Sequence, residues 1–337
     1  MLKPAPRWVL ILLLAVGLGL LLWALSHLAA SQAFFALDWS NFWKSSHGLR
    51  IDYSSSHSVH PPWIIALVWP LTLWRFPFSW SLSLLLTLAV LAFSVPRGES
   101  ASRWAGGLLL LVLSYPALRQ LTDFNFEALL IGGVLLILWA LQRQSIWGLA
   151  VSLVLLSAKV QQSWLLVLVA AWWVWRHWPR RAALSGLGMA LVWMLPFALW
   201  RGADWWQRLA DFAFFGAPHD MSLRATLLRG GASPGLAWAV WGLVLVPSLW
   251  LAFQRIQRPT RIEAAWLVAS GLLLAPYAGF TSMVTPLAIG LIPLALKRPH
   301  LGLPLVSLHY LAFALLPFSE WRIAWESSYW ALVLILV

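Results

Sequence analysis

Long apolar runs, separated by short joints rich in arginine or proline, occupy most of this chain. Most runs are about 15 to 22 residues long, and about 20 residues of helix cross the roughly 30 Å of a bilayer's hydrocarbon core. The pattern predicts an all-α fold, a polytopic transmembrane helical bundle of about twelve crossings. The expected helices lie near residues 8–30, 77–95, 103–118, 126–142, 146–158, 163–175, 182–200, 234–253, 262–279, 283–296, 301–317 and 329–337.

Two apolar segments need a separate interpretation. The first run, Trp8–Ala30, follows Lys3 and Arg7 as in a signal peptide, but it is too long for a signal's apolar core and has no clear small-residue cleavage site. We expect it to be a retained helix. Counting residues 61–74 ("PPWIIALVWPLTLW") as a crossing would invert the sidedness of everything after them. We therefore expect a juxtamembrane or re-entrant helix there, on the outer side, begun by the proline pair.

Composition supports a membrane protein and excludes several kinds of site. Hydrophobic residues make up 61% of the 337 residues and charged residues only 10%, whereas an ordinary soluble domain has about 25% charged residues. The absence of cysteine excludes disulfides, thiolate metal sites and cysteine nucleophiles. The net charge is +12, but the basic residues form short clusters between apolar runs. That arrangement is typical of membrane topology rather than of nucleic-acid binding.

The basic joints predict the topology by the positive-inside rule. Cytoplasmic positions are expected for the N-terminus and for the joints at residues 96–103, 142–144, 176–181, 254–261 and 297–300. Of the 11 acidic residues only Glu99 and Glu263 then lie inside. The others lie outside: Asp38, Asp52, Asp123, Glu127, Asp204, Asp211, Asp220, Glu320 and Glu326. Mixed charges at membrane depth predict an outward polar cavity, or simply solvated loop charges. We expect a single transmembrane domain, 1–337, with outer loops at 31–76 and 201–233.

The first candidate site residue is Asp38, in "LDWSNFWKSSHGL" directly after the first apolar run. Its carboxylate has two interpretations. It caps an interfacial helix by accepting backbone N–H groups, or it serves as a general base at the mouth of the bundle, where partial desolvation raises a carboxyl pKa.

Two further outer segments carry polar candidates. In "HSVHPPWIIALVWPL", His57 and His60 are either surface residues or ligands for phosphate or metal. In "LRQLTDFNFEALL", Arg119, Asp123 and Asn125 lie within a short outer turn. A local salt bridge with turn chemistry explains this second group as well as a substrate site does.

Cations at membrane depth are the remaining candidates. Lys159, in "LVLLSAKVQQSWLLV", has no charged neighbour in sequence. It either snorkels to the headgroups or provides a fixed cation for an anionic substrate, with Gln161 and Gln162 as hydrogen-bonding groups. In the loop "HDMSLRATLLRGG", Arg224 and Arg229 either bind phosphate or pair with Asp220 and lipid headgroups.

In these residues the chain resembles the integral-membrane GT-C glycosyltransferases, specifically the family 87 type that includes polyprenyl-phosphate-mannose-dependent mannosyltransferases. The similar features follow in order over roughly residues 30 to 290: "LDWSNFW", "HPPWIIALVWPL", "LTDFNFEALL", "SAKVQQSW", "MSLRATLLRG" and "LLAPYAGFTS". The turn has Thr122-Asp123 where Gly-Gln is usual in the family, and His60 replaces an aromatic residue before the proline pair.

The resemblance implies a GT-C bundle with outer juxtamembrane helices and an enzyme at the plasma (cytoplasmic) membrane. Such enzymes transfer a sugar, here mannose or a related one, from a polyprenyl phosphate to a lipid or glycan acceptor hydroxyl on the outer face, with inversion. Asp38 is the expected base, and Lys159, Arg224 and Arg119 are expected to stabilise the leaving phosphate. The lipid-linked donor is the substrate. No cofactor, metal or nucleic acid is expected.

Two alternatives to a glycosyltransferase stay open. Outer-facing cations around a polar cavity serve a transporter or flippase of a lipid-linked or anionic solute equally well, although the sequence shows no internal symmetry of the kind that many transporters have. A catalytically inactive scaffold with the enzyme's fold is the third possibility, since a fold does not guarantee an activity.

Overall fold

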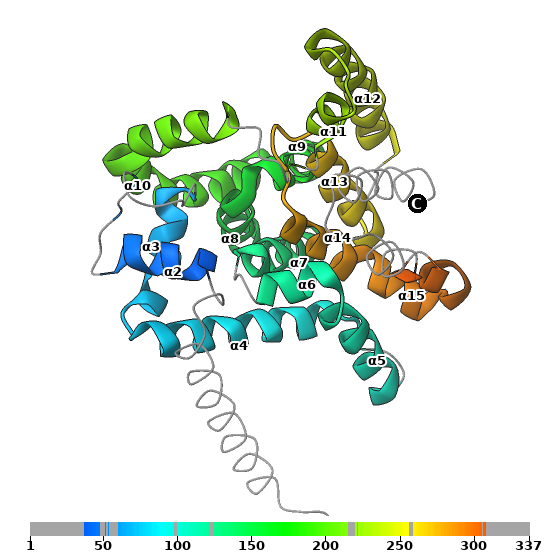
Figure 1. Ribbon diagram of the computed structural model, residues 1–337, viewed down its shortest axis with the longest axis horizontal. Helices are drawn as coiled ribbons and strands as arrows, with labels where there is room; N and C mark the ends of the chain where they lie inside the picture. Colours follow the sequence, from blue (N-terminus) through cyan, green and yellow to red (C-terminus); the bar gives the residue numbers. More distant parts are fainter. Residues whose placement is uncertain are drawn as a thin grey trace, which may run out of the picture.

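The computed structural model describes residues 37–47, 51, 53, 60–97, 100–121, 125–214, 220, 222–255, 259–304 and 306–307. Within these ranges every regular element is a helix and there is no strand (Figure 1). The all-α prediction is therefore confirmed for this part of the chain. The helices expected at 8–30 and 329–337, and most of the one at 301–317, lie outside the described residues.

The helices follow one another with short connections. In chain order they are α2 (Leu37–Ser46), α3 (Pro62–Thr72), α4 (Phe76–Ser94), α5 (Ala101–Val112), α6 (Tyr115–Arg119), α7 (Glu127–Arg143), α8 (Ile146–Leu156), the 3₁₀ turn η2 (Ser157–Lys159), α9 (Val160–His177), α10 (Arg180–Phe214), α11 (Leu223–Arg229), α12 (Pro234–Arg255), α13 (Arg261–Leu273), the 3₁₀ turn η3 (Phe280–Met283), α14 (Val284–Pro286), the π-helix η4 (Leu287–Leu291) and α15 (Ile292–Lys297).

Four helical segments of the described chain are long and apolar enough to cross a bilayer, which indicates a membrane protein. By length and composition they are Phe76–Ser94, Ile146–His177, Arg180–Asp211 and Pro234–Gln254, of which the second consists of α8, η2 and α9 and is interrupted at Lys159. The expected count of about twelve crossings is not supported. Helices α5, α8 and α13 have only 12, 11 and 13 residues. At 1.5 Å per residue they reach about 16 to 20 Å, well short of the roughly 30 Å hydrocarbon core.

The expected helix at 103–118 is two helices. Helix α5 ends at Val112, and α6 starts at Tyr115 with Pro116 in its first turn. A proline cannot donate the backbone hydrogen bond that would continue α5. Ser114 closes the break, because its hydroxyl caps α6 by accepting from the amide of Ala117 at 3.4 Å.

The segment expected as a long outer loop, 201–233, is largely helical. Helix α10 continues past the expected end at residue 200 to Phe214, a length of 35 residues. An i,i+3 ion pair, Arg201 to Asp204 at 2.8 Å, lies on this extension. Ser222 then caps the short helix α11. Polar residues alone led to the loop prediction, whereas their spacing suits a helix surface.

The chain reverses direction at Lys159, as expected. The start of α10 lies beside the start of α8, because a Cβ on Gly186 would lie 3.5 Å from the carbonyl oxygen of Ile146. At the other end of α8, Trp63 Nε1 donates to Ser157 Oγ at 2.7 Å, and its ring packs on Trp205 of α10 at 5.3 Å. Helices α8 and α10 therefore run parallel, and α9 returns between them in sequence.

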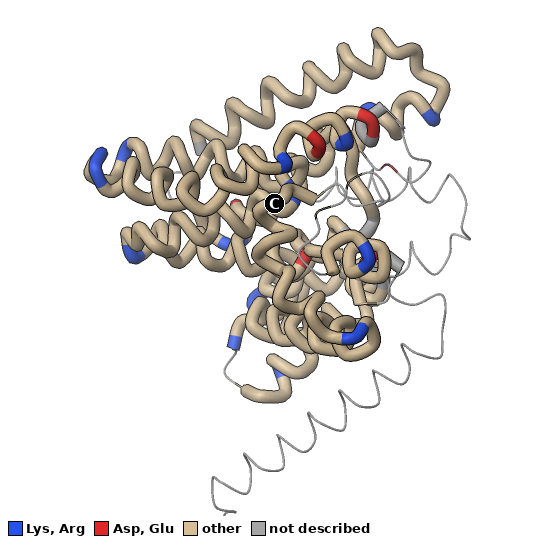
Figure 2. The backbone as a smooth tube through the Cα atoms, turned by 90° about the vertical axis from the view of Figure 1, so that its left-hand side faces the viewer, with Lys and Arg blue, Asp and Glu red and all other residues tan. Residues whose placement is uncertain are grey.

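The basic joints gather at common ends of the helices. Arg261 donates to the carbonyl oxygen of Ser94 at 2.6 Å, which joins the start of α13 to the end of α4. The α7–α8 corner likewise lies beside the start of α10. Figure 2 shows the described Lys and Arg residues mainly at helix ends and turns, with long uncharged stretches between them. The side of the membrane that these ends face stays a prediction.

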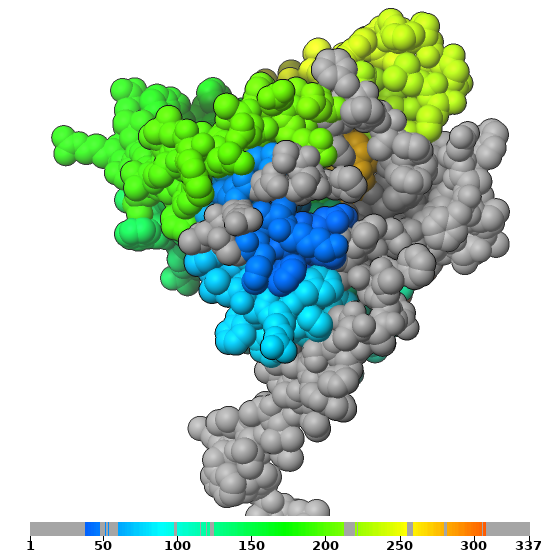
Figure 3. Space-filling view, turned by 60° about the vertical axis from the view of Figure 1, so that its left-hand side comes forward, coloured from blue at the N-terminus to red at the C-terminus, as the bar shows by residue number. Residues whose placement is uncertain are grey.

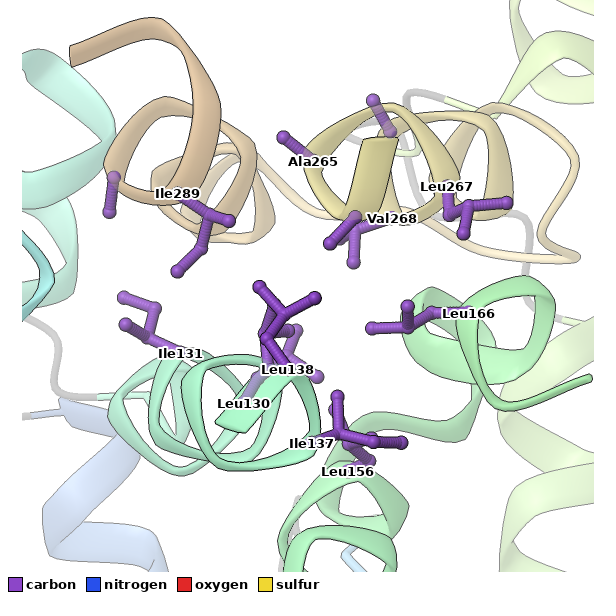
Figure 4. Packing of buried hydrophobic residues seen from close by; sticks show 14 of the residues in the cluster. Leu130, Ile131, Ile137, Leu138, Leu156, Leu166, Ala265, Leu267, Val268 and Ile289 are labelled. Carbon is purple, nitrogen blue, oxygen red and sulfur yellow. The ribbon is translucent and has the colours of Figure 1, made fainter. Parts of the chain in front are cut away.

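Helix α7 lies at the centre of the main core. Its Leu130, Ile131, Ile137 and Leu138 face side chains of α8, α9, α13 and η4, among them Leu156, Leu166, Val268 and Ile289 (Figure 4). Helix α13 packs closely on α9, where Trp164 Nε1 donates to the carbonyl oxygen of Gly271 at 3.1 Å.

A second core lies under the short helices α2 and α3. Trp39, Phe42, Trp63 and Ile64 are buried there. Figure 3 shows α2 (dark blue) between α4 (cyan) and α10 (green). Helix α3 begins at Pro62, which confirms the predicted role of the proline pair. With 11 residues it is too short to span a bilayer.

A substitution at the α9–α13 contact tests this packing. A Cβ on Gly271 would lie 2.6 Å from the backbone carbonyl oxygen of Gln162, whereas one on Gly132, inside α7, would meet nothing within 4 Å. We expect Gly271→Ala to lower the free energy of unfolding by about 1–3 kcal/mol. Gly132→Ala should be neutral or stabilise by up to about 1 kcal/mol. Thermal unfolding in detergent measures both; equal effects would contradict the close approach.

Candidate functional site

A buried charge cluster holds the start of α7 against the turn at Lys159. It consists of Glu127, Lys159, Gln162, Ser282 and Thr285, and the two charged side chains are almost completely buried. The ammonium of Lys159 donates to Glu127 Oε1. Gln162 Nε2 donates to the same oxygen at 2.9 Å and also to Ser282 Oγ. Thr285 Oγ1 donates to Glu127 Oε2 at 2.8 Å. Both carboxylate oxygens are thus hydrogen-bonded.

Local backbone geometry brings these groups together. Glu127 lies in the first turn of α7, where the helix dipole favours a negative charge. Lys159 ends the 3₁₀ turn with φ −140° and ψ 72°, which interrupts the helix between α8 and α9. Ser163 satisfies the carbonyl groups freed by that break, since its hydroxyl donates to Leu156 O at 2.8 Å and Lys159 O at 3.2 Å.

His60 lies beside the buried charge cluster. Burial, together with the nearby positive charge of Lys159, lowers the pKa of the His60 imidazole to about 3. The ring packs edge-on against Phe126 with centroids 4.2 Å apart. The hydroxyl of Tyr53 donates to the carbonyl oxygen of His60 at 2.8 Å. His60 is therefore a neutral group held in place on both its backbone and its ring.

A second polar group consists of Asp38, Asp220, Arg229 and Tyr277, and we call it the outer cluster after the side of the membrane that the sequence predicts for it. Asp220 is 1% exposed, and its Oδ1 accepts from the amides of Ser222 and Ala278, each at 2.9 Å. It thereby joins the segment before α11 to the segment after α13.

The pKa shifts of Tyr277 and Asp220 show which charges of the outer cluster lie near them. Burial, and then the negative charges of Asp220 and Asp38, raise the pKa of the Tyr277 hydroxyl to about 12. Burial also raises the pKa of Asp220, opposed by its amide hydrogen bonds and by the positive charge of Arg229. Asp38 itself is exposed in the first turn of α2. Asp38 is therefore near Tyr277 and Arg229 is near Asp220, although Asp38 and Arg229 are nearly two hundred residues apart in sequence.

Aromatic rings lie between the two polar groups. Trp39, the residue after Asp38, packs on Phe126 with ring centroids 6.1 Å apart, and Phe42 packs on the same ring at 4.8 Å. Phe126 in turn contacts His60 beside the buried charge cluster. The path from Asp38 to Lys159 therefore passes through an aromatic layer.

Lys159 has a charged partner that is distant in sequence. It was expected as a cation without a neighbouring charge, available to an anionic substrate. Its ammonium is instead paired with Glu127, which lies 32 residues away in sequence and was grouped with the solvated outer acids. The charge of Lys159 is compensated inside the protein.

The other predicted site residues lie in several separate environments. Arg229 joins the outer cluster, and the guanidinium of Arg224 lies 5.2 Å above the ring of Trp238. Asn125 Oδ1 accepts from the amide of Phe126 at 2.8 Å, which is turn chemistry. Gln161 is half-buried, and Gln162 is the glutamine that reaches Glu127. His57, Asp123 and the side chain of Arg119 lie outside the described residues.

Several cluster members were not predicted. Ser282, Thr285 and Tyr277 gave no charge signal, whereas Asp220 was named as one of two possible partners for Arg224 and Arg229. Glu127 had a detectable signal, because it directly precedes an apolar helix at the same end of the bundle as Lys159. Among the described residues no group of three or more His, Asp or Glu side chains is placed to hold a metal ion.

Comparison of the chain with protein-family models, with curated proteins and with solved structures gives no match. The function is therefore inferred from the residues and their geometry.

The neutral state of His60 predicts a pH-dependent stability. An unfolded imidazole takes up a proton as the pH falls through about 6.5, whereas the folded protein keeps His60 neutral to about pH 3. The unfolded state then binds more protons, so stability falls with decreasing pH by at most about 1.4 kcal/mol per unit and is constant above about pH 7.

Thermal unfolding between pH 5 and pH 8 measures this dependence. His60→Gln should flatten it, whereas the same change at the exposed His47 should leave it intact. An unchanged slope in His60→Gln would contradict the assignment.

Proposed function

We propose that this chain is an integral-membrane glycosyltransferase of the GT-C type, which transfers mannose or a related sugar from a polyprenyl phosphate to an acceptor hydroxyl. One observation carries the proposal. An exposed carboxylate, Asp38, lies near Tyr277, and an arginine, Arg229, lies near Asp220, whose carboxylate is hydrogen-bonded to the amide of the residue after Tyr277. A base and a cation are the two groups that such a transfer requires.

Asp38 has the role of general base in this proposal. The acceptor hydroxyl loses its proton as the anomeric carbon gains positive character, and an exposed carboxylate is accessible to that hydroxyl. Its place in the first turn of α2 makes capping and catalysis compatible, since one carboxylate oxygen suffices for each.

The leaving phosphate is assigned to Arg229 and Arg224 of α11. Charge on the phosphate develops in the transition state, and a guanidinium donates paired hydrogen bonds to it. Lys159 is given a supporting role in place of the direct one expected above, because Glu127 neutralises its charge. The buried charge cluster then fixes the starts of α7 and α9 behind the aromatic layer.

The positive-inside rule supports a cytoplasmic position for the basic joints. The site would then lie on the outer face of the plasma membrane, with a lipid or glycan as acceptor. The short, non-spanning helices α2 and α3 match the outer juxtamembrane helices that the GT-C resemblance implies.

A transporter or flippase of a lipid-linked or anionic solute is the second candidate. The specific observation in its favour is the interrupted helix at Lys159 with a buried ion pair beside it. Discontinuous helices and intramembrane charges often mark transport sites.

Reconstituted protein distinguishes the two candidates. Purified chain in liposomes receives labelled polyprenyl-phosphate sugars and a membrane extract of acceptors. We expect sugar transfer that falls by about 10²- to 10⁴-fold in Asp38→Asn. Asp204→Asn is the matched control. This acid is exposed on α10, and within the described part of the chain its ion pair is with its helix neighbour Arg201.

Each result has a distinct meaning. Transfer that survives Asp38→Asn would remove Asp38 as base. Movement of the solute or lipid across the bilayer without any transfer would overturn the enzyme and favour the transporter.

A further inference from the structure

The corner between α9 and α10 concentrates positive charge at a helix end. Arg176, His177, Arg180 and Arg181 are exposed there. The sequence contains no aspartate or glutamate from residue 128 to residue 203, so the corner has no acid on either of its helices until Asp204. Uncompensated cations on an exposed surface favour an anionic ligand.

Two of these arginines stack on tryptophan rings. The guanidinium of Arg176 lies 4.3 Å above the ring of Trp172, and that of Arg180 lies 5.6 Å above the ring of Trp175. The two rings are 40% and 51% exposed. A guanidinium stacked by its face keeps its N–H edges available for phosphate oxygens. Exposed indoles prefer the membrane–water interface, which places these arginines at headgroup level.

The α7–α8 corner extends the same surface. Gly186 of α10 lies against Ile146, which brings Arg143 and Trp147 to the start of α10. Trp147 is 71% exposed, and Trp139, which lies against Gly148, is 48% exposed. Two corners of the bundle thus present arginines and exposed indoles together.

The basic joint at the start of α13 differs from the α9–α10 corner in its hydrogen bonds and in having an acid. At the start of α13, Arg261 donates to the carbonyl oxygen of Ser94. Thr260 and Glu263 form a capping box there, so an acid accompanies the cations. A positive-inside bias alone would make these joints equivalent, whereas within the described residues only the α9–α10 corner combines acid-free charge with stacked, exposed indoles.

We propose that the α9–α10 corner, with Arg143 beside it, binds the headgroup phosphate of an anionic phospholipid. The guanidinium edges of Arg176 and Arg180 donate to the phosphate oxygens, Arg181 adds charge, and the indoles contact the upper acyl region. The site is independent of the proposed transferase activity.

Native mass spectrometry of the full chain tests this proposal. Protein purified in neutral detergent is titrated with phosphatidylglycerol or with phosphatidylcholine of the same chain length. We expect selective retention of phosphatidylglycerol, reduced roughly five-fold for each arginine removed in the series R176Q, R180Q and R181Q. R75Q is the matched control, because Arg75 is also exposed and follows an exposed tryptophan, Trp74, but lies before α4. It should retain the lipid as the unsubstituted chain does.

Three outcomes would overturn the site. These are equal retention of both lipids, unchanged phosphatidylglycerol retention in the triple variant, and a loss in R75Q as large as in the triple variant. Displacement of the lipid by millimolar glycerol phosphate would also count against it, since a soluble phosphate would then be the ligand. A thermal unfolding curve of each variant separates loss of binding from loss of fold.

Discussion

The ion pair between Lys159 and Glu127 is the interaction on which one end of the molecule depends. Two charges buried in a bundle cost much in desolvation unless both are paired and hydrogen-bonded. Gln162 and Thr285 donate hydrogen bonds to the carboxylate of Glu127. Ser163 donates to a carbonyl group left free where the helix is interrupted at Lys159. Five elements, α7, η2, α9, η3 and α14, are thereby joined at one point, although most of their other contacts are apolar and non-directional.

The rest of the architecture follows from separating two kinds of polar surface. Basic corners with exposed indoles lie where α7 meets α8 and where α9 meets α10. The buried charge cluster, the aromatic layer and the outer cluster lie toward the opposite ends of those helices, under α2 and α3. An apolar core centred on α7 separates them. An exposed acid, Asp38, therefore lies at one end, while the other end is mainly cationic, with Glu263 used in the capping box of α13.

Apolar periodicity predicted much of the fold. Helices α4, α7 and α12 lie within one or two residues of the expected ranges, because each is bounded by proline, charge or a capping residue. Crossing number was not predictable, since an apolar run does not show where Tyr115-Pro116 breaks a helix or how far α10 continues. The turn at Lys159 was predicted but its partner was not. Sequence spacing does not show a contact across 32 residues, and one residue of helix rotation decides whether Gln161 or Gln162 points inward.

A double-substitution cycle on the ion pair tests the account most directly. Lys159→Met and Glu127→Gln each leave one buried charge without its partner, so each should lower the free energy of unfolding in detergent by about 3–5 kcal/mol. The combined variant removes both charges and keeps similar volumes. It should be clearly more stable than the sum of the two single effects predicts, and close to the better single variant. Strictly additive losses, or single variants as stable as the unsubstituted chain, would contradict the central role of the pair.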